Sequence, residues 1–278
     1  MKAIKLVFCL FVLNNLNAQN IKVMTFNIRY NTERDGINKW DNRKDRAAEM
    51  VKFYEADFCG MQEALIGQIN DLQERLPEYA HFGLGRDDGK EKGEFSPIFY
   101  SKTKFKLLKN ETFWLSETPE KPSKGWDANL PRIVTWGYFQ DIKSKKKFYV
   151  FNTHYDHIGQ VARAESSKLI LRKIKEIAGN ELAILTGDFN ATPTEEPIKI
   201  ILSELTETST LSQSPHFGPE STFNGFEAKE VDNRRIDYVF VNKPKTNVLK
   251  HATLTNTWGG LFASDHHPVL AVINISIK

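Results

Sequence analysis

Asp188 and Asn190 stand two residues apart, directly after the apolar run of residues 182–185 and the turn residue Gly187. Side chains two positions apart on an extended segment point to the same face. Two polar side chains at the end of a buried strand are costly unless something is paired with them. In open α/β sheets, ligands bind at this carboxyl end of the strands. The pair therefore indicates a ligand site at the end of a buried strand.

Other polar residues take the same position, at or beside the end of an apolar strand-like run: Asn27, Glu63, His154, Asp237, Asp265 and His266. Oxygen ligands in this number suit a hard divalent cation, with Mg²⁺ as the natural candidate and Mn²⁺ or Ca²⁺ as alternatives. Zinc would need more His or Cys ligands. The two histidines supply acid–base groups near neutral pH. Taken one at a time, each residue is also a common turn or structural residue. Their repetition at independent strand ends is what indicates a site.

The elements that must position these residues follow from the spacing of apolar side chains. We expect helices at residues 41–54, 66–76, 160–178 and 195–205, and strands at 21–28, 57–62, 95–100, 105–109, 132–142, 147–155, 182–185, 236–241, 246–254 and 268–275. Strands and helices alternate over the first part of the chain, which indicates an α/β layered fold. Because strands outnumber helices, we expect two packed, mostly antiparallel or mixed sheets with helices outside.

The first 18 residues have the layout of a secretory signal peptide, with Lys2 and Lys5, an apolar run over residues 6–13 and a cleavage position after Ala18. A buried N-terminal strand is the alternative. The signal predicts a secreted or periplasmic protein whose single domain covers residues 19–278. No later run is long and apolar enough to span a membrane.

The charge balance limits the class of partner. Losing Lys2 and Lys5 with the signal would take the 38 basic residues to 36, against 35 acidic ones, so the net charge would fall from +3 to +1. A dedicated duplex-binding protein usually carries a strong basic excess. The balance therefore favours a small or short phosphate ligand over long nucleic acid. We expect the protein to be a monomer.

The motif series resembles that of the endonuclease/exonuclease/phosphatase superfamily. The matching segments are TFN at residues 25–27, QE at 62–63, NTH at 152–154, TGDFN at 186–190, RIDY at 235–238 and SDHHP at 264–268. They occur in the family's order and span nearly all of the mature chain. The resemblance implies a four-layer α/β sandwich that hydrolyses phosphoesters with the help of a metal ion.

The resemblance also implies a role for each acidic or amide residue. Glu63 would be the main Mg²⁺ ligand, with Asn27 and Asp265 near the metal. Asp188 would orient or deprotonate the attacking water, and Asn190 would hold a phosphate oxygen.

The two histidines take the remaining roles that the resemblance implies. His266, oriented by Asp237, would contact the phosphate or act as a base. His154 would be the acid at the leaving group or would stabilise the developing charge. Glu94, just before an expected strand, stands where related nucleases have the glutamate that partners this histidine. A solvated loop glutamate is the alternative interpretation of Glu94.

Substrate choice depends on the loops around such a site. Arg29, Arg86 and Arg132 are candidates for binding phosphate or an acidic substituent, and Trp126 is a candidate for stacking on a sugar or base. The alternative is that the arginines form ion pairs and the tryptophan braces a long loop.

The favoured function is a secreted Mg²⁺-dependent phosphoesterase that acts on a small or glycan-linked phosphodiester or monoester by in-line attack of water. A secreted nuclease of low specificity is the first alternative. A non-catalytic phosphate- or glycan-binding protein is the second, although a pure binder has no need of a leaving-group acid.

Overall fold

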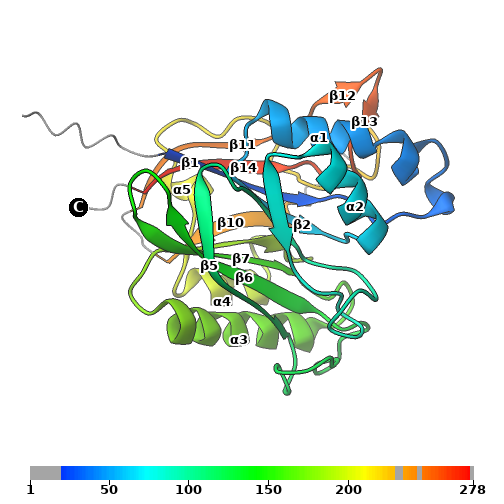
Figure 1. Cartoon of the computed structure of the whole chain (residues 1–278). Helices are drawn as coiled ribbons and strands as arrows, with labels where there is room; N and C mark the ends of the chain where they lie inside the picture. Colours follow the sequence, from blue (N-terminus) through cyan, green and yellow to red (C-terminus); the bar gives the residue numbers. More distant parts are fainter. Residues whose placement is uncertain (1–19, 229–233, 243–245, 276–278) are drawn as a thin grey trace, which may run out of the picture.

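The computed structural model describes residues 20–228, 234–242 and 246–275. Within these ranges two six-stranded sheets pack face to face, with helices on both outer faces (Figure 1). The predicted α/β sandwich of two mixed sheets flanked by helices is therefore confirmed. The expected signal segment, residues 1–18, lies outside the described ranges. Among the described helices, none has both the length and the apolar character that a membrane span needs.

The first sheet has the strand order β11-β14-β1-β2-β4-β3. Its only parallel pair among the described strands is β1 with β2. In chain order the strands are β1 (Asn20–Asn27), β2 (Phe58–Gln62), β3 (Tyr79–Phe82), β4 (Ile98–Ser101), β11 (Asn247–Thr253) and β14 (Val269–Asn274).

The second sheet has the order β5-β6-β7-β8-β10-β9, and its only parallel pair in the described ranges is β7 with β8. The strands are β5 (Phe105–Trp114), β6 (Ile133–Asp141), β7 (Lys147–His154), β8 (Ala183–Asp188), β9 (Thr206–Glu207) and β10 (Asp237–Val241). A separate small hairpin joins β12 (Thr257–Trp258) to β13 (Leu261–Phe262).

Helices α1 (Lys44–Phe53) and α2 (Ile66–Arg75) cover the first sheet, and α3 (Gln160–Ala178) and α4 (Glu196–Leu202) cover the second (Figure 1). Two 3₁₀ helices, η1 (Glu33–Asn38) and η2 (Trp40–Asn42), precede α1, and the short α5 (Thr208–Leu211) follows β9. Three apolar clusters fill the layers: one between α1, α2 and the first sheet, one between the sheets, and one between the second sheet and α3 and α4.

The space between the sheets changes from apolar to polar along the strands. On β1, Ile21 and Val23 belong to the apolar cluster between the sheets, whereas Thr25 and Asn27, two and four residues after Val23, are buried polar residues on the same face. The same change occurs on β8, from Ile184 to the buried Asp188. Strand alternation therefore places polar side chains between the sheets at one end of the sandwich.

Gly60 lies at a close approach of the two sheets at this polar end. A Cβ atom at this position would stand 2.3 Å from Thr186 Oγ1 and 2.5 Å from Asn152 Oδ1 of the other sheet. The absence of a side chain lets these polar groups meet across the interface.

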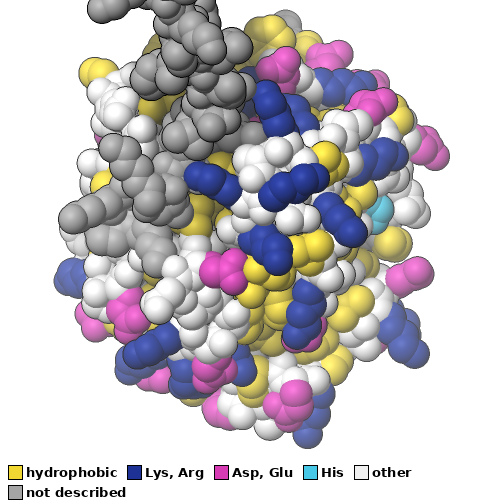
Figure 2. Space-filling model, turned by 60° about the vertical axis from the view of Figure 1, so that its left-hand side comes forward, with side chains coloured by type: hydrophobic (Ala, Val, Ile, Leu, Met, Phe, Trp, Pro, Cys, Tyr) yellow, Lys and Arg dark blue, Asp and Glu magenta, His cyan; other side chains and the backbone are white. Residues whose placement is uncertain are grey.

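Most charged side chains stand on the outside of the molecule, although a few, such as Asp57 and Glu207, are buried away from this polar end. Figure 2 shows one face on which Lys and Arg side chains stand apart from one another among apolar and uncharged surface. Charged groups are rarely fully buried unless they are paired. The polar end of the sandwich gathers three buried carboxylates, those of Asp188, Asp237 and Asp265, and this concentration marks a site.

Candidate active site

Strand register brings the predicted residues together. On the parallel pair β7 and β8, His154 lies opposite Asp188, and on the antiparallel pair β8 and β10, Asp237 lies opposite the same Asp188. The first sheet reaches the same point, because the side-chain amide nitrogen of Asn27 donates to Asp188 Oδ2 at 2.9 Å and to Glu63 Oε1 at 3.0 Å. Residues from both sheets thus converge on Asp188.

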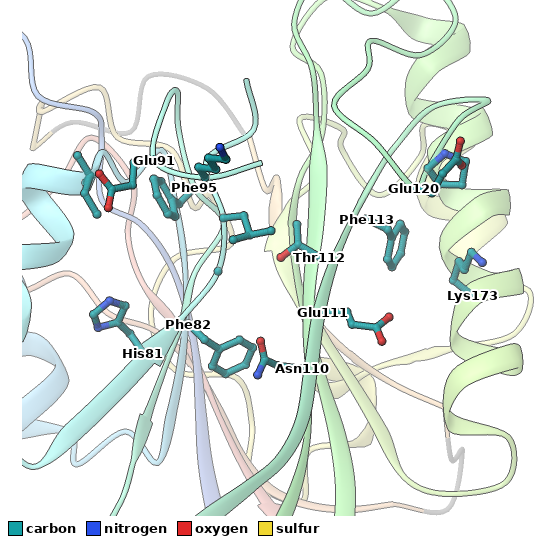
Figure 3. A pocket seen from close by; sticks show the side chains of 15 residues that line it. His81, Phe82, Glu91, Phe95, Asn110, Glu111, Thr112, Phe113, Glu120 and Lys173 are labelled. Atoms are coloured by element: carbon teal, nitrogen blue, oxygen red, sulfur yellow. The ribbon is translucent and has the colours of Figure 1, made fainter. Parts of the chain in front are cut away.

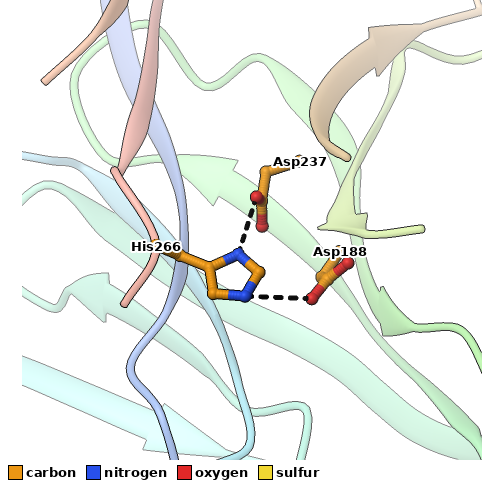
Figure 4. A group of neighbouring side chains, drawn as sticks. All are labelled: Asp188, Asp237 and His266. Carbon is orange, nitrogen blue, oxygen red and sulfur yellow. Dashed lines mark hydrogen bonds and ion pairs between the residues drawn. The ribbon is translucent and has the colours of Figure 1, made fainter. Parts of the chain in front are cut away.

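His266 lies between two carboxylates (Figure 4). Its Nδ1 is 2.9 Å from Asp237 Oδ2, and its Nε2 is 3.8 Å from Asp188 Oδ2. Burial alone would lower the pKa of His266, but the ion pair and hydrogen bond with Asp237 outweigh it and raise the pKa to about 10. Burial, and then repulsion from Asp237, raises the pKa of Asp188 to about 7. At neutral pH the structure therefore holds a protonated histidine beside an aspartate that can exchange a proton.

His154 lies on the other side of Asp188, with Nε2 at 3.6 Å from Asp188 Oδ2 and 3.1 Å from the amide nitrogen of Asn190. That amide nitrogen also donates to the backbone oxygen of Tyr155 at 3.0 Å. Burial, followed by the charges of Arg132 and Arg86, lowers the pKa of His154 well below its usual range. The imidazole is therefore neutral at physiological pH. A phosphate oxygen bound by Asn190 would replace the contact between Asn190 and His154.

Glu94 lies beside His154, as the resemblance implied, but its Oε2 is 3.9 Å from His154 Nδ1, which is beyond hydrogen-bond distance. Arg86 binds both Glu94 oxygens instead, at 2.6 and 3.0 Å. Within the described residues, His154 Nδ1 is buried without a hydrogen-bond partner. Arg86 therefore holds the carboxylate that would otherwise pair with the histidine.

Glu63 and Asp265 lie about 200 residues apart in the chain, and both approach the guanidinium of Arg29. Arg29 NH1 is 3.9 Å from Glu63 Oε2, and Arg29 Nε is 3.7 Å from Asp265 Oδ2. Burial, and then repulsion that includes Glu63, raises the pKa of Asp265. A half-buried and a buried carboxylate that face one positive charge are the kind of donors that a hard divalent cation needs. Glu63 and Asp265 therefore fit a metal site, whereas Asn27 places its amide nitrogen toward Glu63 and its oxygen toward the backbone N–H of Arg29.

A second group with metal-ligand chemistry is Asp188, Asp237 and His266, whose ligand atoms lie within 4.8 Å of one another. A histidine must be unprotonated to bind a metal, but His266 keeps its proton because of Asp237. We therefore favour Glu63 and Asp265 as the residues that would hold a metal. We assign to His266 the neutralisation of phosphate charge, and to Asp237 the role of keeping His266 protonated.

Three of the predicted residues at the polar end of the sandwich have strained backbones. Arg29, Glu63 and Asn190 have φ values of 55°, 60° and 45°. Residues other than glycine rarely adopt this left-handed region. Each of them follows the end of a strand, so the turn aims its side chain across the edge of the sheet. Strain that the fold maintains at several converging positions is characteristic of functional sites.

Arg43 is a supporting residue that the sequence did not reveal. It is fully buried, and its guanidinium donates to the backbone oxygens of Ile28, Arg29 (2.8 Å) and Ala263 (3.2 Å). Burial lowers its pKa to about 10. These bonds tie the end of β1 to the segment that carries Asp265. Arg43 lies near the start of the helix predicted over residues 41–54, and that pattern gives no sign of this role.

Asn152 joins the sheets beneath the site. Its oxygen accepts from Gln62 Nε2 at 2.7 Å and from Thr186 Oγ1 at 3.0 Å, and its nitrogen donates to the backbone oxygens of Met61 (2.7 Å) and Pro97 (3.0 Å). The NTH segment signalled this residue, but its structural role depends on contacts distant in sequence.

The four residues predicted to bind substrate differ in their location and exposure. Arg29 lies in the site. Arg86 and Arg132 are 7% and 4% exposed, much like His154 at 6%, and Arg86 binds Glu94 while Arg132 lies beside Asp156. Their contact with substrate stays a prediction. Trp126 packs against the core of the second sheet, and its backbone N–H lies 3.2 Å from the Glu117 carboxylate.

Asp156 and His157 are further residues that sequence reasoning missed. The Asp156 carboxylate accepts from the backbone N–H groups of Asn129, Leu130, Ile158 and Gly159. Arg132 Nε lies 3.4 Å from Asp156, and Arg132 NH2 lies 3.0 Å from His157 Nδ1. Their place two and three residues after His154 was the available signal. The cluster fixes the long 114–132 loop against the active-site end.

Comparison with known proteins identifies a family and structures with the same fold. The model of the Endonuclease/Exonuclease/phosphatase family matches residues 24–266. A family protein from Bacteroides vulgatus is 40% identical, with a TM-score of 0.88 over 92% of this chain and 98% of that one. A mannosyl-6-phosphatase from Bacteroides thetaiotaomicron is 38% identical, with a TM-score of 0.87 over 91% and 99% of the two chains.

A more distant structure shares the fold. D. rerio TDP2, solved with a single-stranded DNA product, has a TM-score of 0.71 at 18% identity and covers 92% of this chain and 99% of its own. The chain belongs to the endonuclease/exonuclease/phosphatase family and is a metal-dependent hydrolase of phosphoester bonds.

Proposed function

We propose that this protein is a secreted, Mg²⁺-dependent phosphatase that removes phosphate from a sugar phosphate, either free or at the end of a glycan. The observation that carries the proposal is the convergence of Glu63, His154, Asp188 and His266 at one end of the sandwich. A phosphoester is protected by its negative charge, so its hydrolysis requires charge neutralisation, a positioned water and a protonated leaving group.

Carboxylates provide for charge neutralisation and for the positioned water. When bound at Glu63 and Asp265, a divalent cation neutralises phosphate charge and orients the ester. Asp188, whose pKa lies near 7, accepts a hydrogen bond from the attacking water and takes its proton. Asn27 holds the Asp188 carboxylate by its 2.9 Å hydrogen bond, which keeps this oxygen aimed at the site.

The histidines act on the phosphate. His266, kept protonated by Asp237, donates a charge-assisted hydrogen bond to a phosphate oxygen. His154 faces the leaving group and is neutral in the free protein. The charge of a bound phosphate favours its protonated form, which lets His154 supply the proton that the departing oxygen needs.

The substrate class rests on two observations. The phosphatase from B. thetaiotaomicron, at 38% identity, is named for a mannosyl 6-phosphate substrate. The near-neutral charge of the chain does not favour long nucleic acid. We propose Mg²⁺ as the metal because the candidate ligands are oxygens, secretion because of the signal layout of residues 1–18, and a monomeric state.

A short panel of substrates tests this proposal. Purified protein with Mg²⁺ is given mannose 6-phosphate, p-nitrophenyl phosphate, bis-p-nitrophenyl phosphate and supercoiled plasmid DNA. We expect phosphate release to be fastest from mannose 6-phosphate. Plasmid nicking at a lower enzyme concentration than sugar dephosphorylation would overturn the proposal in favour of a nuclease. Mass spectrometry of the secreted protein tests cleavage after Ala18.

A further inference from the structure

A groove of about 1020 Å³ crosses the free edges of both sheets at the active-site end. Its lining includes Phe82 at the end of β3 and residues 110–113 of β5. Among the described strands, β3 pairs only with β4 and β5 only with β6, so both are edge strands. The volume is at the upper end of the range of about 300 to 1,000 Å³ that is typical of ligand pockets.

The groove is close to the catalytic centre but separate from it. Phe95 lines the groove, and the preceding residue, Glu94, contacts His154 at 3.9 Å. Phe95 is only 5% exposed, so it forms part of a wall between the two spaces. A ligand in the groove would therefore lie beside the bound phosphate without touching the catalytic groups.

The side chains of the groove can both donate and accept hydrogen bonds. Figure 3 shows Asn110 and Thr112 pointing to one side of β5, toward Phe82, and Glu111 and Phe113 pointing to the other side, toward Lys173 of α3. Strand alternation produces this arrangement. Amide, hydroxyl and carboxylate groups beside partly exposed apolar surface suit a ligand with many hydroxyl groups and apolar C–H faces.

The charges of the groove do not suit a polyanion. Three carboxylates line it, those of Glu91, Glu111 and Glu120, against two lysines. Two of these charges are already paired, because Lys173 lies 2.9 Å from Glu176 and Glu111 lies 2.9 Å from Lys109, which leaves Glu91 and Glu120 against Lys90. A nucleic acid strand would meet more carboxylates than free cations.

An added peptide strand is also disfavoured. The β5 edge carries exposed charged residues, among them Lys106 and Lys109, and its register shifts between Leu107 and Lys109. Charges and a bulge on an edge strand oppose pairing with another strand. A neutral, polyhydroxylated chain is the ligand class that remains consistent with all these features.

We propose that this groove is a non-catalytic binding site for a neutral oligosaccharide. It would hold the glycan part of a phosphorylated glycan while the phosphate occupies the catalytic centre. That use of the groove rests on the proposed function, but the saccharide binding itself does not. A failure of hydrolysis and a failure of binding are therefore separate results.

Binding is tested by following the backbone amide NMR signals of the protein during titration with mannotetraose, maltotetraose and cellotetraose, none of which carries phosphate. We expect at least one saccharide to shift the signals of residues 110–113. Asn110→Ala should weaken its binding about fivefold to tenfold, which corresponds to the loss of one or two hydrogen bonds. Glu111→Gln tests a second exposed contact of the groove independently.

The control variant is Lys106→Ala, which changes an exposed residue of the same strand outside the groove. It should bind the saccharide like the wild type, and all three variants should hydrolyse p-nitrophenyl phosphate at the wild-type rate. The proposal is overturned if no saccharide shifts these signals at millimolar concentration, if Asn110→Ala and Glu111→Gln both bind like the wild type, or if only a single-stranded oligonucleotide binds at residues 110–113.

Discussion

At the scale of single residues, the site depends on what surrounds Asp188. Asn27, His154 and His266 all approach one of its oxygens, at 2.9, 3.6 and 3.8 Å. A buried carboxylate is costly without such partners. Because burial and Asp237 also raise its pKa, Asp188 is suited to accept a proton near neutral pH.

Asp188→Asn should remove most of the activity and leave the fold intact. The amide has the same shape but cannot take a proton, so kcat should fall about 10²-fold to 10⁴-fold. Phosphate release from p-nitrophenyl phosphate measures the loss, and circular dichroism verifies the fold. Asp45→Asn on α1, an exposed carboxylate far from the strand ends, is the matched control. Wild-type turnover by Asp188→Asn would rule out its role as a base.

The activity should also depend on pH through Asp188. The base must be ionised, and below its pKa of about 7 it is increasingly protonated. We therefore expect kcat/KM to fall as the pH drops below about 7, by up to about tenfold per pH unit. A bound cation favours the carboxylate form, so this acid limb should move to lower pH as the Mg²⁺ concentration rises. A flat profile between pH 5 and pH 8 would contradict the assignment.

At the scale of elements, the sequence predicts regular segments better than irregular ones. The helix expected at residues 160–178 is confirmed as α3, because its apolar side chains recur at helical spacing without interruption. Strand β3 was missed, since its four residues follow Pro77 too closely to show a pattern. Strand β5 was predicted to end at residue 109 but continues to Trp114, because the register shift after Leu107 breaks the alternation.

Site residues at strand ends could likewise be predicted better than those whose partners lie in loops. Residues such as Asn27 and Asp237 could be predicted because strand ends are visible in the sequence and register then brings them together. Arg43 and Asp156 could not, because their partners are backbone groups of loops whose path the sequence does not show. The contacts of Arg86 with Glu94 and of Arg132 with Asp156 could not be predicted for the same reason.

Asn152→Ala should destabilise the junction between the sheets. The change removes, in a buried place, the hydrogen bonds that Gln62, Thr186 and two backbone oxygens make with Asn152. The expected loss is about 2–4 kcal/mol, or on the order of 5–10 °C in Tm. Differential scanning calorimetry measures it, with Asn180→Ala in the exposed turn after α3 as control. Equal Tm values for the two variants would show that the junction contributes little.

At the scale of the whole molecule, the interface between the sheets is apolar along most of its length and polar at one end. The apolar part stabilises the fold, and the polar end is available for chemistry because the rest of the sandwich holds it in place. Buried ionisable groups are not confined to the site. His251 on β11 is 4% exposed, and burial followed by the nearby His216 lowers its pKa to about 3.

His251 should make stability depend on pH. Above about pH 6.5 the imidazole is neutral in both the folded and the unfolded chain, so its contribution is fully present. As the pH falls toward 3, the unfolded chain binds a proton that the folded chain excludes, and stability is lost by up to about 1.4 kcal/mol per pH unit. The cost of His251→Asn, measured by urea unfolding, should therefore shrink between pH 7.5 and pH 5. A cost that does not change with pH would contradict a buried neutral histidine.

The central claim is that Glu63 belongs to a metal site required for phosphoester hydrolysis. The most direct test measures phosphate release from p-nitrophenyl phosphate against Mg²⁺ concentration for the wild type and for Glu63→Gln, after treatment with a chelator. We predict that the chelated wild type is inactive and recovers with Mg²⁺, and that Glu63→Gln needs at least about tenfold more Mg²⁺. Full activity of the chelated protein, or a Glu63→Gln variant with the wild-type Mg²⁺ dependence, would contradict the account.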